Sequence, residues 1–260
     1  MPQMTEYPHG TFSWVELSTP DTGAGKSFYS QLFGWDTEDA PVPGGGLYTM
    51  CKKDGHYVAA IQVLQEEMRA AGHPPFWLSY VSVDDVDATV AKVEGLGGKV
   101  MAPPFDVMDA GRMAVIQDPE NAALALWQAK EHPGAGLVTE PGALCWNELA
   151  TNDPDKAKAF YTGLLGWSVD TQDMGGMEYT TFSVGDRPNG GMARINPQMG
   201  PMPPSWGVSF AVEDTDKSAA MIEDLGGSIV VPPTDFPGGR FAIATDPQGA
   251  FFGVVTITPQ

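Results

Sequence analysis

The sequence predicts an α+β protein built from four βαβββ modules. The first observation behind this prediction is an internal repeat: residues 14–35 and 146–167 are identical at 11 of 22 positions without a gap. The second is a finer spacing, in which a Trp is followed by an acid after seven residues and by a Gly after twenty. This spacing starts at Trp14, Trp77, Trp146 and Trp206. A module that was duplicated twice therefore accounts for the chain.

The first module shows each expected element in order. The alternating run "FSWVEL", residues 12–17, predicts a strand. Asp21 then opens a helix as its N-cap, and Gly34 ends the helix as its C-cap. Three further strands are predicted in the runs "WDTED" (35–39), "LYTMC" (47–51) and "YVAAIQV" (57–63).

The other modules repeat this order. In the second module the strand "WLSYVSV" (77–83) precedes a helix led by Asp84, and three strands follow in "KVMAPPF", "RMAVIQD" and "ALALWQA". Asp153 and Glu213 lead the helices of the third and fourth modules. We therefore expect an N-terminal domain over residues 8–130, a Gly- and Pro-containing linker over 131–141 and a C-terminal domain over 142–260.

Charge and composition exclude several classes of function. The chain has 14 basic and 33 acidic residues and a net charge of −19, so nucleic acids and anionic membranes would be repelled. No run of about 20 apolar residues and no secretory signal is present, which predicts a soluble, cytoplasmic protein. The two cysteines, Cys51 and Cys145, do not form a CxxC motif, so neither a disulfide framework nor a zinc knuckle is expected.

Several motifs resemble the vicinal-oxygen-chelate superfamily, which includes glyoxalase I, bleomycin-resistance proteins and extradiol dioxygenases. They are "FYSQLFGW" and "FYTGLLGW", the runs "VDDVDATVAKVEGLGGKV" and "VEDTDKSAAMIEDLGGSI", and the turns "DPENA" and "DPQGA". The resemblance covers about residues 10–128 and 142–257. It implies two domains, in each of which two modules form a U-shaped, mostly antiparallel sheet around a cleft, with the helices outside. The tandem glyoxalase-like or hydroxylase-like members are the most similar subgroup.

The resemblance also implies where a metal would bind. In metal-dependent relatives, a His near the start of a module's first strand and a Glu in the strand after the "DP" turn are ligands. Here those positions hold the four module-start tryptophans and, after the turns, Ala125 and Gly253, none of which can bind a metal. The histidines His9, His56, His73 and His132 all precede residue 133. We therefore expect no metal and no cofactor, and we do not expect a metal-dependent dioxygenase.

Two acids are candidates for catalysis. Glu16 and Glu148 each lie two residues after a Trp, so strand alternation places the carboxylate and the indole on one face. If that face lines the cleft, as the resemblance implies, burial would raise the carboxyl pKa and favour general-base catalysis. The alternative is a structural acid paired with a basic residue such as Arg112 or Arg240.

Aromatic residues are the candidates for ligand binding. Flat indole rings stack on planar ligands, so the clefts are expected to be lined by Trp14, Trp77, Trp127, Trp146 and Trp206, with packing in the core as the alternative. Trp35 and Trp167 are expected beneath the helices. Met192, Met199 and Met202 lie in the run "GGMARINPQMGPMPPSW", where flexible thioethers suit varied apolar ligands. Arg112 and Arg240 could orient an anionic ligand or form surface ion pairs.

Three functions are compatible with these features. The first is metal-independent binding or sequestration of a small hydrophobic or aromatic molecule, as in bleomycin-resistance proteins. The alternative is a glyoxalase-like lyase or isomerase that uses Glu16, Glu148 or both as general base. The third is an interaction protein with vestigial clefts and an acidic surface. Both modules of each cleft lie in one chain, so either a monomer or a homodimer fits the sequence.

Overall fold

The computed structural model describes residues 4–42, 46–176, 178–196 and 202–258. Its first sheet has the strand order β2-β3-β4-β1-β5-β8-β7-β6 and its second the order β10-β11-β12-β9-β13-β16-β15-β14. In each sheet two strand pairs are parallel and the others antiparallel. The α+β prediction, the four modules and the two tandem domains are confirmed.

The first domain contains β1 (Phe12–Thr19), α1 (Thr22–Phe33), β2 (Asp36–Pro41), β3 (Leu47–Lys53), β4 (His56–Val63), α2 (Glu66–Ala70), β5 (Phe76–Ser82), α3 (Val86–Val93), the short helix η1 (Glu94–Leu96), β6 (Lys99–Val107), β7 (Gly111–Gln117) and β8 (Ala123–Ala129). The second contains β9 (Leu144–Thr151), α4 (Pro154–Leu165), β10 (Ser168–Asp173), β11 (Glu178–Val184), β12 (Arg187–Arg194), β13 (Ser205–Ala211), α5 (Thr215–Asp224), β14 (Ser228–Phe236), β15 (Gly239–Thr245) and β16 (Phe251–Ile257). No helix of the described residues is long and apolar enough to cross a membrane.

Helix capping follows the sequence with one shift. Asp21 and Asp153 cap α1 and α4 as predicted, and Gly34 and Gly166 end these helices in the left-handed conformation. In the second and fourth modules, however, the caps are Asp85 and Asp214, one residue later than predicted. Trp14 and Trp146 lie seven residues before the caps of their modules. In the second and fourth modules the residues seven before the caps are Leu78 and Gly207, so these, and not Trp77 and Trp206, are equivalent to the two tryptophans. Because neighbouring strand residues point to opposite faces, this shift moves Trp77 and Trp206 out of the clefts.

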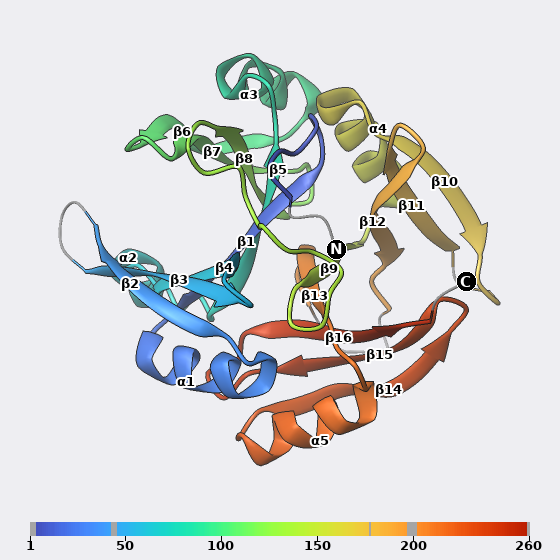
Figure 1. The fold of residues 1–260 in the computed structure, drawn as a ribbon. Coiled ribbons are helices and arrows are strands. Elements are labelled where there is room, and N and C mark those ends of the chain that lie inside the picture. The colour runs from blue at the N-terminus through green and yellow to red at the C-terminus, as the bar shows by residue number, and fades with distance from the viewer. Residues whose placement is uncertain (1–3, 43–45, 177, 197–201, 259–260) are drawn as a thin grey trace.

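The two sheets lie back to back, with α1 beside α5 at one end and α3 beside α4 at the other (Figure 1). Each end is a hydrophobic core to which both domains contribute. At one end Tyr29 of α1 donates its hydroxyl proton to Asp246 of the second domain, over 3.2 Å. At the other, Tyr161 of α4 donates to Asp118 of the first, over 3.1 Å. The "FY" and "DP" motifs thus join the two domains.

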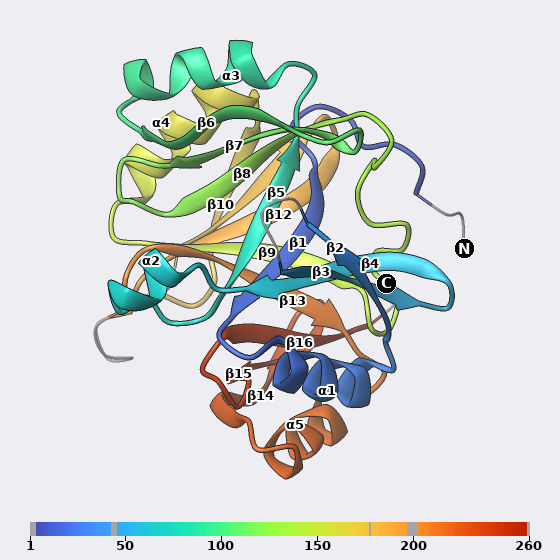
Figure 2. The same ribbon diagram turned by 90° about the vertical axis from the view of Figure 1, so that its left-hand side faces the viewer.

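The back-to-back arrangement leaves the concave faces of the sheets on opposite sides of the molecule. Figure 2 views the molecule from the side on which the first sheet opens, and the second sheet opens on the opposite side.

Candidate functional site

The concave face of the first sheet carries a cluster of large side chains around Glu16. Trp14 and Glu16 come from β1, Tyr48 from β3, Tyr80 from β5 and Trp127 from β8. The indole N–H of Trp14 donates to the Tyr48 hydroxyl over 3.4 Å. Strand alternation thus places the acid beside aromatic rings, as the sequence predicted.

Glu16 is sealed from solvent, with only 4% of its surface exposed. Burial raises the pKa of this carboxyl to about 7, although hydrogen bonds with Tyr48 and Tyr80 lower it in part. The amide of Gln62 also donates to Oε1 of Glu16. This carboxylate is therefore held by donors from its own domain and does not pair with Arg112.

The segment after β8 closes the first cleft. Ala135 is buried in the cluster around Trp14, and Val138 packs against it. Backbone hydrogen bonds hold the segment in place: the Ala135 N–H donates to Ser13 over 2.8 Å, and the Gly136 N–H donates to Tyr57 over 2.7 Å. The stretch predicted as a linker is thus also a cover for the first cleft.

His132 is part of this cover. Its ring meets the Trp14 ring edge-on at 4.6 Å, and its carbonyl accepts the indole N–H of Trp127 over 2.9 Å. Its Nε2 is buried and has no hydrogen-bond partner among the described residues. Burial lowers the pKa of this imidazole to about 4. Surface depressions of about 210 and 440 Å³ flank the cover, and neither is lined by Glu16 or Glu148.

The second cleft repeats the acid and its two aromatic neighbours. The indole N–H of Trp146 donates to the Tyr179 hydroxyl over 3.0 Å, and this hydroxyl donates to Oε2 of Glu148 over 2.9 Å. The surrounding protein raises the pKa of Glu148, and the Tyr179 bond lowers it in part. Unlike Glu16, Glu148 is an exposed residue. Its carboxylate lies deep in the cleft and can still be reached from solvent.

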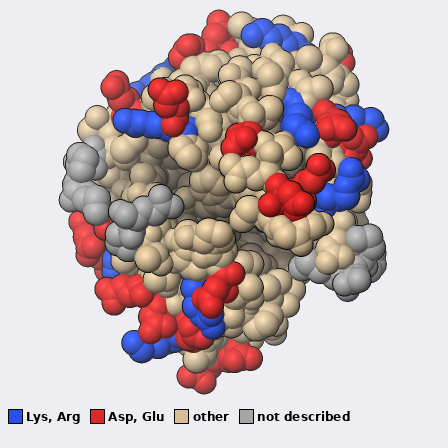
Figure 3. Space-filling model, turned by 90° about the vertical axis from the view of Figure 1, so that its right-hand side faces the viewer, with Lys and Arg blue, Asp and Glu red and all other residues tan. Residues whose placement is uncertain are grey.

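Small residues form the floor of the second cleft. By strand register, Gly191 replaces Ala60, Gly207 replaces Leu78, Ser209 replaces Tyr80, Gly253 replaces Ala125 and Val255 replaces Trp127. At Gly191 a Cβ would collide with the Tyr179 hydroxyl as it stands, so the tyrosine would have to move. At Gly207 a Cβ would meet only the Glu148 carbonyl oxygen, at 3.7 Å. The face that this cleft opens onto is hollowed near its middle, with mostly uncharged residues around the hollow (Figure 3).

The wall of the second cleft opposite Tyr179 is apolar. Phe236 of β14 and Phe241 of β15 lie with their ring centroids 6.0 Å apart, and Ile243 follows on the same face of β15. Phe236 is 39% exposed although it is large and apolar. An exposed aromatic wall that faces a carboxylate is typical of a ligand-binding surface.

Trp77, Trp206 and Met192 do not line the clefts, so the prediction that they contact a ligand there is wrong. Trp77 and Trp206 are buried between the domains, where their indole N–H groups donate to Tyr29 over 3.1 Å and to Tyr161 over 2.8 Å. Met192 is buried in the same core as Trp206, on the face of β12 opposite Gly191. Trp35 and Trp167 are core residues as predicted. Met202 is exposed, and Met199 lies outside the described residues.

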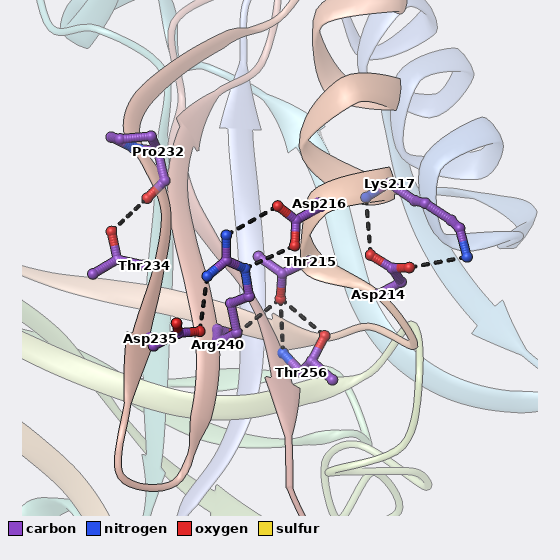
Figure 4. Close-up of polar contacts among 9 residues, drawn as sticks. All are labelled: Asp214, Thr215, Asp216, Lys217, Pro232, Thr234, Asp235, Arg240 and Thr256. Carbon is purple, nitrogen blue, oxygen red and sulfur yellow. Dashed lines mark hydrogen bonds and ion pairs between the residues drawn. The ribbon is translucent and has the colours of Figure 1, made fainter.

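The two arginines also point away from the clefts. Arg240 binds Asp216 of α5 over 2.7 Å and Asp235 of β14 over 2.8 Å (Figure 4). Thr215 at the start of α5 donates to the Arg240 carbonyl, so the strand and the helix are joined twice. Arg112 pairs in the same way with Asp87 and Asp106. Both arginines therefore form surface ion pairs, which was the second of the two roles expected from the sequence. Neither lies where it could orient a ligand in a cleft.

Sequence reasoning missed the tyrosines and the glycine floor. Tyr48 and Tyr179 occupy equivalent places in the repeat, so their alignment is the signal that could have identified them. Gly191 and Gly207 carry no such signal, because a Gly in a strand is equally consistent with a bulge or a close backbone contact.

The donor set of the clefts does not fit a transition metal. The described residues contain no group of three or more His, Cys, Asp and Glu side chains arranged to hold a metal ion. Trp14, Ala125, Trp146 and Gly253 occupy positions where the resemblance implies ligands, and none of these side chains can donate an electron pair to such an ion. Among the described residues, the donors to Glu16 are the Gln62 amide and tyrosine hydroxyls, the donor to Glu148 is the Tyr179 hydroxyl, and no imidazole is bound to either acid. No chemical step is therefore assigned to a metal.

The family model described as "Glyoxalase/Bleomycin resistance protein/Dioxygenase superfamily" matches residues 11–126 and 143–254. "Putative glyoxylase CFP32" of Mycobacterium tuberculosis is 47% identical over the full length of both chains. "Anthracycline biosynthesis protein DnrV" of Streptomyces peucetius is 36% identical over 98% of this chain and 96% of its own.

Two solved structures with this fold are more distant in sequence. The Mn(II)-bound glyoxalase from Novosphingobium aromaticivorans has a TM-score of 0.65 at 19% identity, covering 95% of this chain and 82% of its own. The 2,3-dioxygenase LapB from Pseudomonas has a TM-score of 0.65 at 15% identity, covering 95% and 93%. At these identities the likeness concerns the fold alone.

Proposed function

Because the chain belongs to the glyoxalase/bleomycin resistance protein/dioxygenase superfamily, whose sheets enclose clefts, we propose that it binds a small, flat hydrophobic molecule in the second cleft without a metal. The observation that carries this proposal is the difference between the two clefts. Glu16 is sealed by its own domain and the cover, whereas the equivalent Glu148 is open above a floor of small residues.

The walls of the second cleft favour a planar ligand. Trp146 and Tyr179 stand on one side, and Phe236 and Phe241 on the other. Aromatic faces bind flat rings through stacking and apolar burial, while a few polar groups fix the orientation. The name of the Streptomyces relative connects that protein with anthracycline biosynthesis, which agrees with an aromatic ligand here.

A cleft-filling substitution tests this proposal. Gly207→Leu copies the first domain, where Leu78 holds this place, and the backbone has room for the added Cβ. We expect apolar aromatic probes such as naphthalene derivatives to bind the wild type and to lose binding in Gly207→Leu, measured by isothermal titration calorimetry. Gly95→Leu is the matched control, because a Cβ there meets nothing within 4 Å. Equal binding by Gly207→Leu and the wild type would exclude the second cleft.

A second candidate function is proton transfer by Glu148, as in a lyase or isomerase. Three features of Glu148 favour it. Burial raises the pKa of the carboxyl, solvent can still reach the carboxylate, and the Tyr179 hydroxyl orients it. The test is deuterium exchange from heavy water into the carbon beside the carbonyl of 2-tetralone, followed by NMR. We expect exchange above background with the wild type and with the exposed-acid control Glu223→Gln, and background exchange with Glu148→Gln. Exchange in Glu148→Gln at the wild-type rate would exclude Glu148 as the base.

A further inference from the structure

The two clefts contain the same acid, but its hydrogen-bond donors differ. Glu16 is bound by the Gln62 amide and by the hydroxyls of Tyr48 and Tyr80. In the second domain Tyr179 matches Tyr48, whereas Ala193 and Ser209 occupy the places of Gln62 and Tyr80. Among the described residues, the structure shows one hydrogen bond to the Glu148 carboxylate, from Tyr179 to Oε2. Oε1 of Glu148 therefore remains available to a donor from outside the chain.

The space above the acid differs in the same way. In the first domain Leu78 lies beside Glu16 on the next strand, and the Tyr80 ring packs edge-on against Trp127 at 6.2 Å. Gly207, Ser209 and Val255 stand at these three positions in the second domain. The first domain thus fills its own cleft with a phenol ring, and the second domain leaves the corresponding space to solvent.

The charge around Glu148 restricts the ligand further. Burial and Tyr179 are the influences on the pKa of Glu148, and no Lys or Arg side chain among the described residues contributes to it. Arg240, the basic residue of β15 in the same sheet, is bound to Asp216 and Asp235 on the opposite face. An anionic group placed beside Glu148 would be repelled without compensation.

We propose that the ligand of the second cleft is a neutral phenol. Its ring occupies the space that Leu78 and Tyr80 fill in the first domain, between Tyr179 and the wall formed by Phe236 and Phe241. Its hydroxyl donates to Oε1 of Glu148, as the Tyr80 hydroxyl does to Glu16. This inference rests on the proposed binding function and adds to it the chemical group that the cleft recognises.

The test compares three probes that share one ring system: 2-naphthol, 2-methoxynaphthalene and 2-naphthoate. Isothermal titration calorimetry on the wild type should give 2-naphthol binding about tenfold or more tighter than 2-methoxynaphthalene, because the ether cannot donate a hydrogen bond to the carboxylate. 2-Naphthoate should bind more weakly still. Glu148→Gln should reduce the preference for the phenol, since its acceptor is uncharged. Glu223→Gln, which removes an equal charge on exposed α5, should keep the preference.

A second variant copies the first domain directly. In Gly207→Leu/Ser209→Tyr the protein supplies its own phenol, and binding of 2-naphthol should be lost while the thermal unfolding temperature is retained. Wild-type protein that binds 2-naphthol and 2-methoxynaphthalene equally, or binds 2-naphthoate best, would overturn the phenol assignment and leave the binding function standing. Wild-type protein that binds none of the three would contradict the binding function itself.

Discussion

Replacing Glu16 with Gln should change how the stability of the protein depends on pH. The pKa of this carboxyl is raised from 4.5 to about 7 in the folded protein. The folded state therefore holds the proton more tightly than the unfolded chain, and stability falls as pH rises from 4.5 through about 7. The difference between the two pKa values corresponds to a total loss of ~3 kcal/mol. The variant Glu16→Gln has no ionisable group at this position, so its stability should not fall in this way.

The assay is urea-induced unfolding, followed by tryptophan fluorescence, of the wild type and Glu16→Gln at pH 5.5 and 8.5. This range stays above the isoelectric point of about 4.3. Because the unfolded chain is already mostly ionised at pH 5.5, the variant should gain about 2 kcal/mol on the wild type between the two pH values. Titration of His132 is common to both proteins and cancels. Glu223→Gln should show no such gain. A difference between Glu16→Gln and the wild type that does not change with pH would refute a Glu16 carboxyl whose pKa is raised by burial.

Three further predictions concern the cover, the floor and the outer face. His132→Phe should resist acid better than the wild type, since a pKa lowered to about 4 means that stability is lost as pH falls below 6.5; thermal unfolding at pH 7 and pH 5 measures this. Gly191→Ala should displace Tyr179 from Glu148 and lower the free energy of unfolding by about 1–3 kcal/mol, as measured by urea unfolding; unchanged stability would contradict the tight contact. Arg240→Gln should change the free energy of unfolding only slightly, because its ion pairs lie at the surface, and should leave probe binding unchanged in calorimetry, whereas loss of binding would place Arg240 at the site.

Much of the fold follows from local sequence rules. The duplicated segment around Trp14 and Trp146, the caps Asp21 and Asp153 and the strand alternation all predict elements that the structure contains. Alternation also predicts that Glu16 shares a face with Trp14, because this relation depends only on the two-residue period of a strand. These features are decided within a few residues of the chain.

The residues that line the clefts were harder to predict from the sequence. A one-residue shift of the caps at Asp85 and Asp214 turns Trp77 and Trp206 into the core between the domains, where each donates to a tyrosine of its own domain, Tyr29 or Tyr161. A spacing rule that tolerates one residue of error cannot assign the face of a strand, because each residue reverses it.

The sequence by itself determined the four modules, the two domains and the pairing of an acid with aromatic residues in each. Only the tertiary structure decided that the first cleft is closed and the second open. The closure depends on residues 132–138 reaching back to β1 and β4 and on the size of side chains that meet from separate strands. Such contacts join residues far apart in the chain, so no local pattern of Ala135 or Gly207 encodes them.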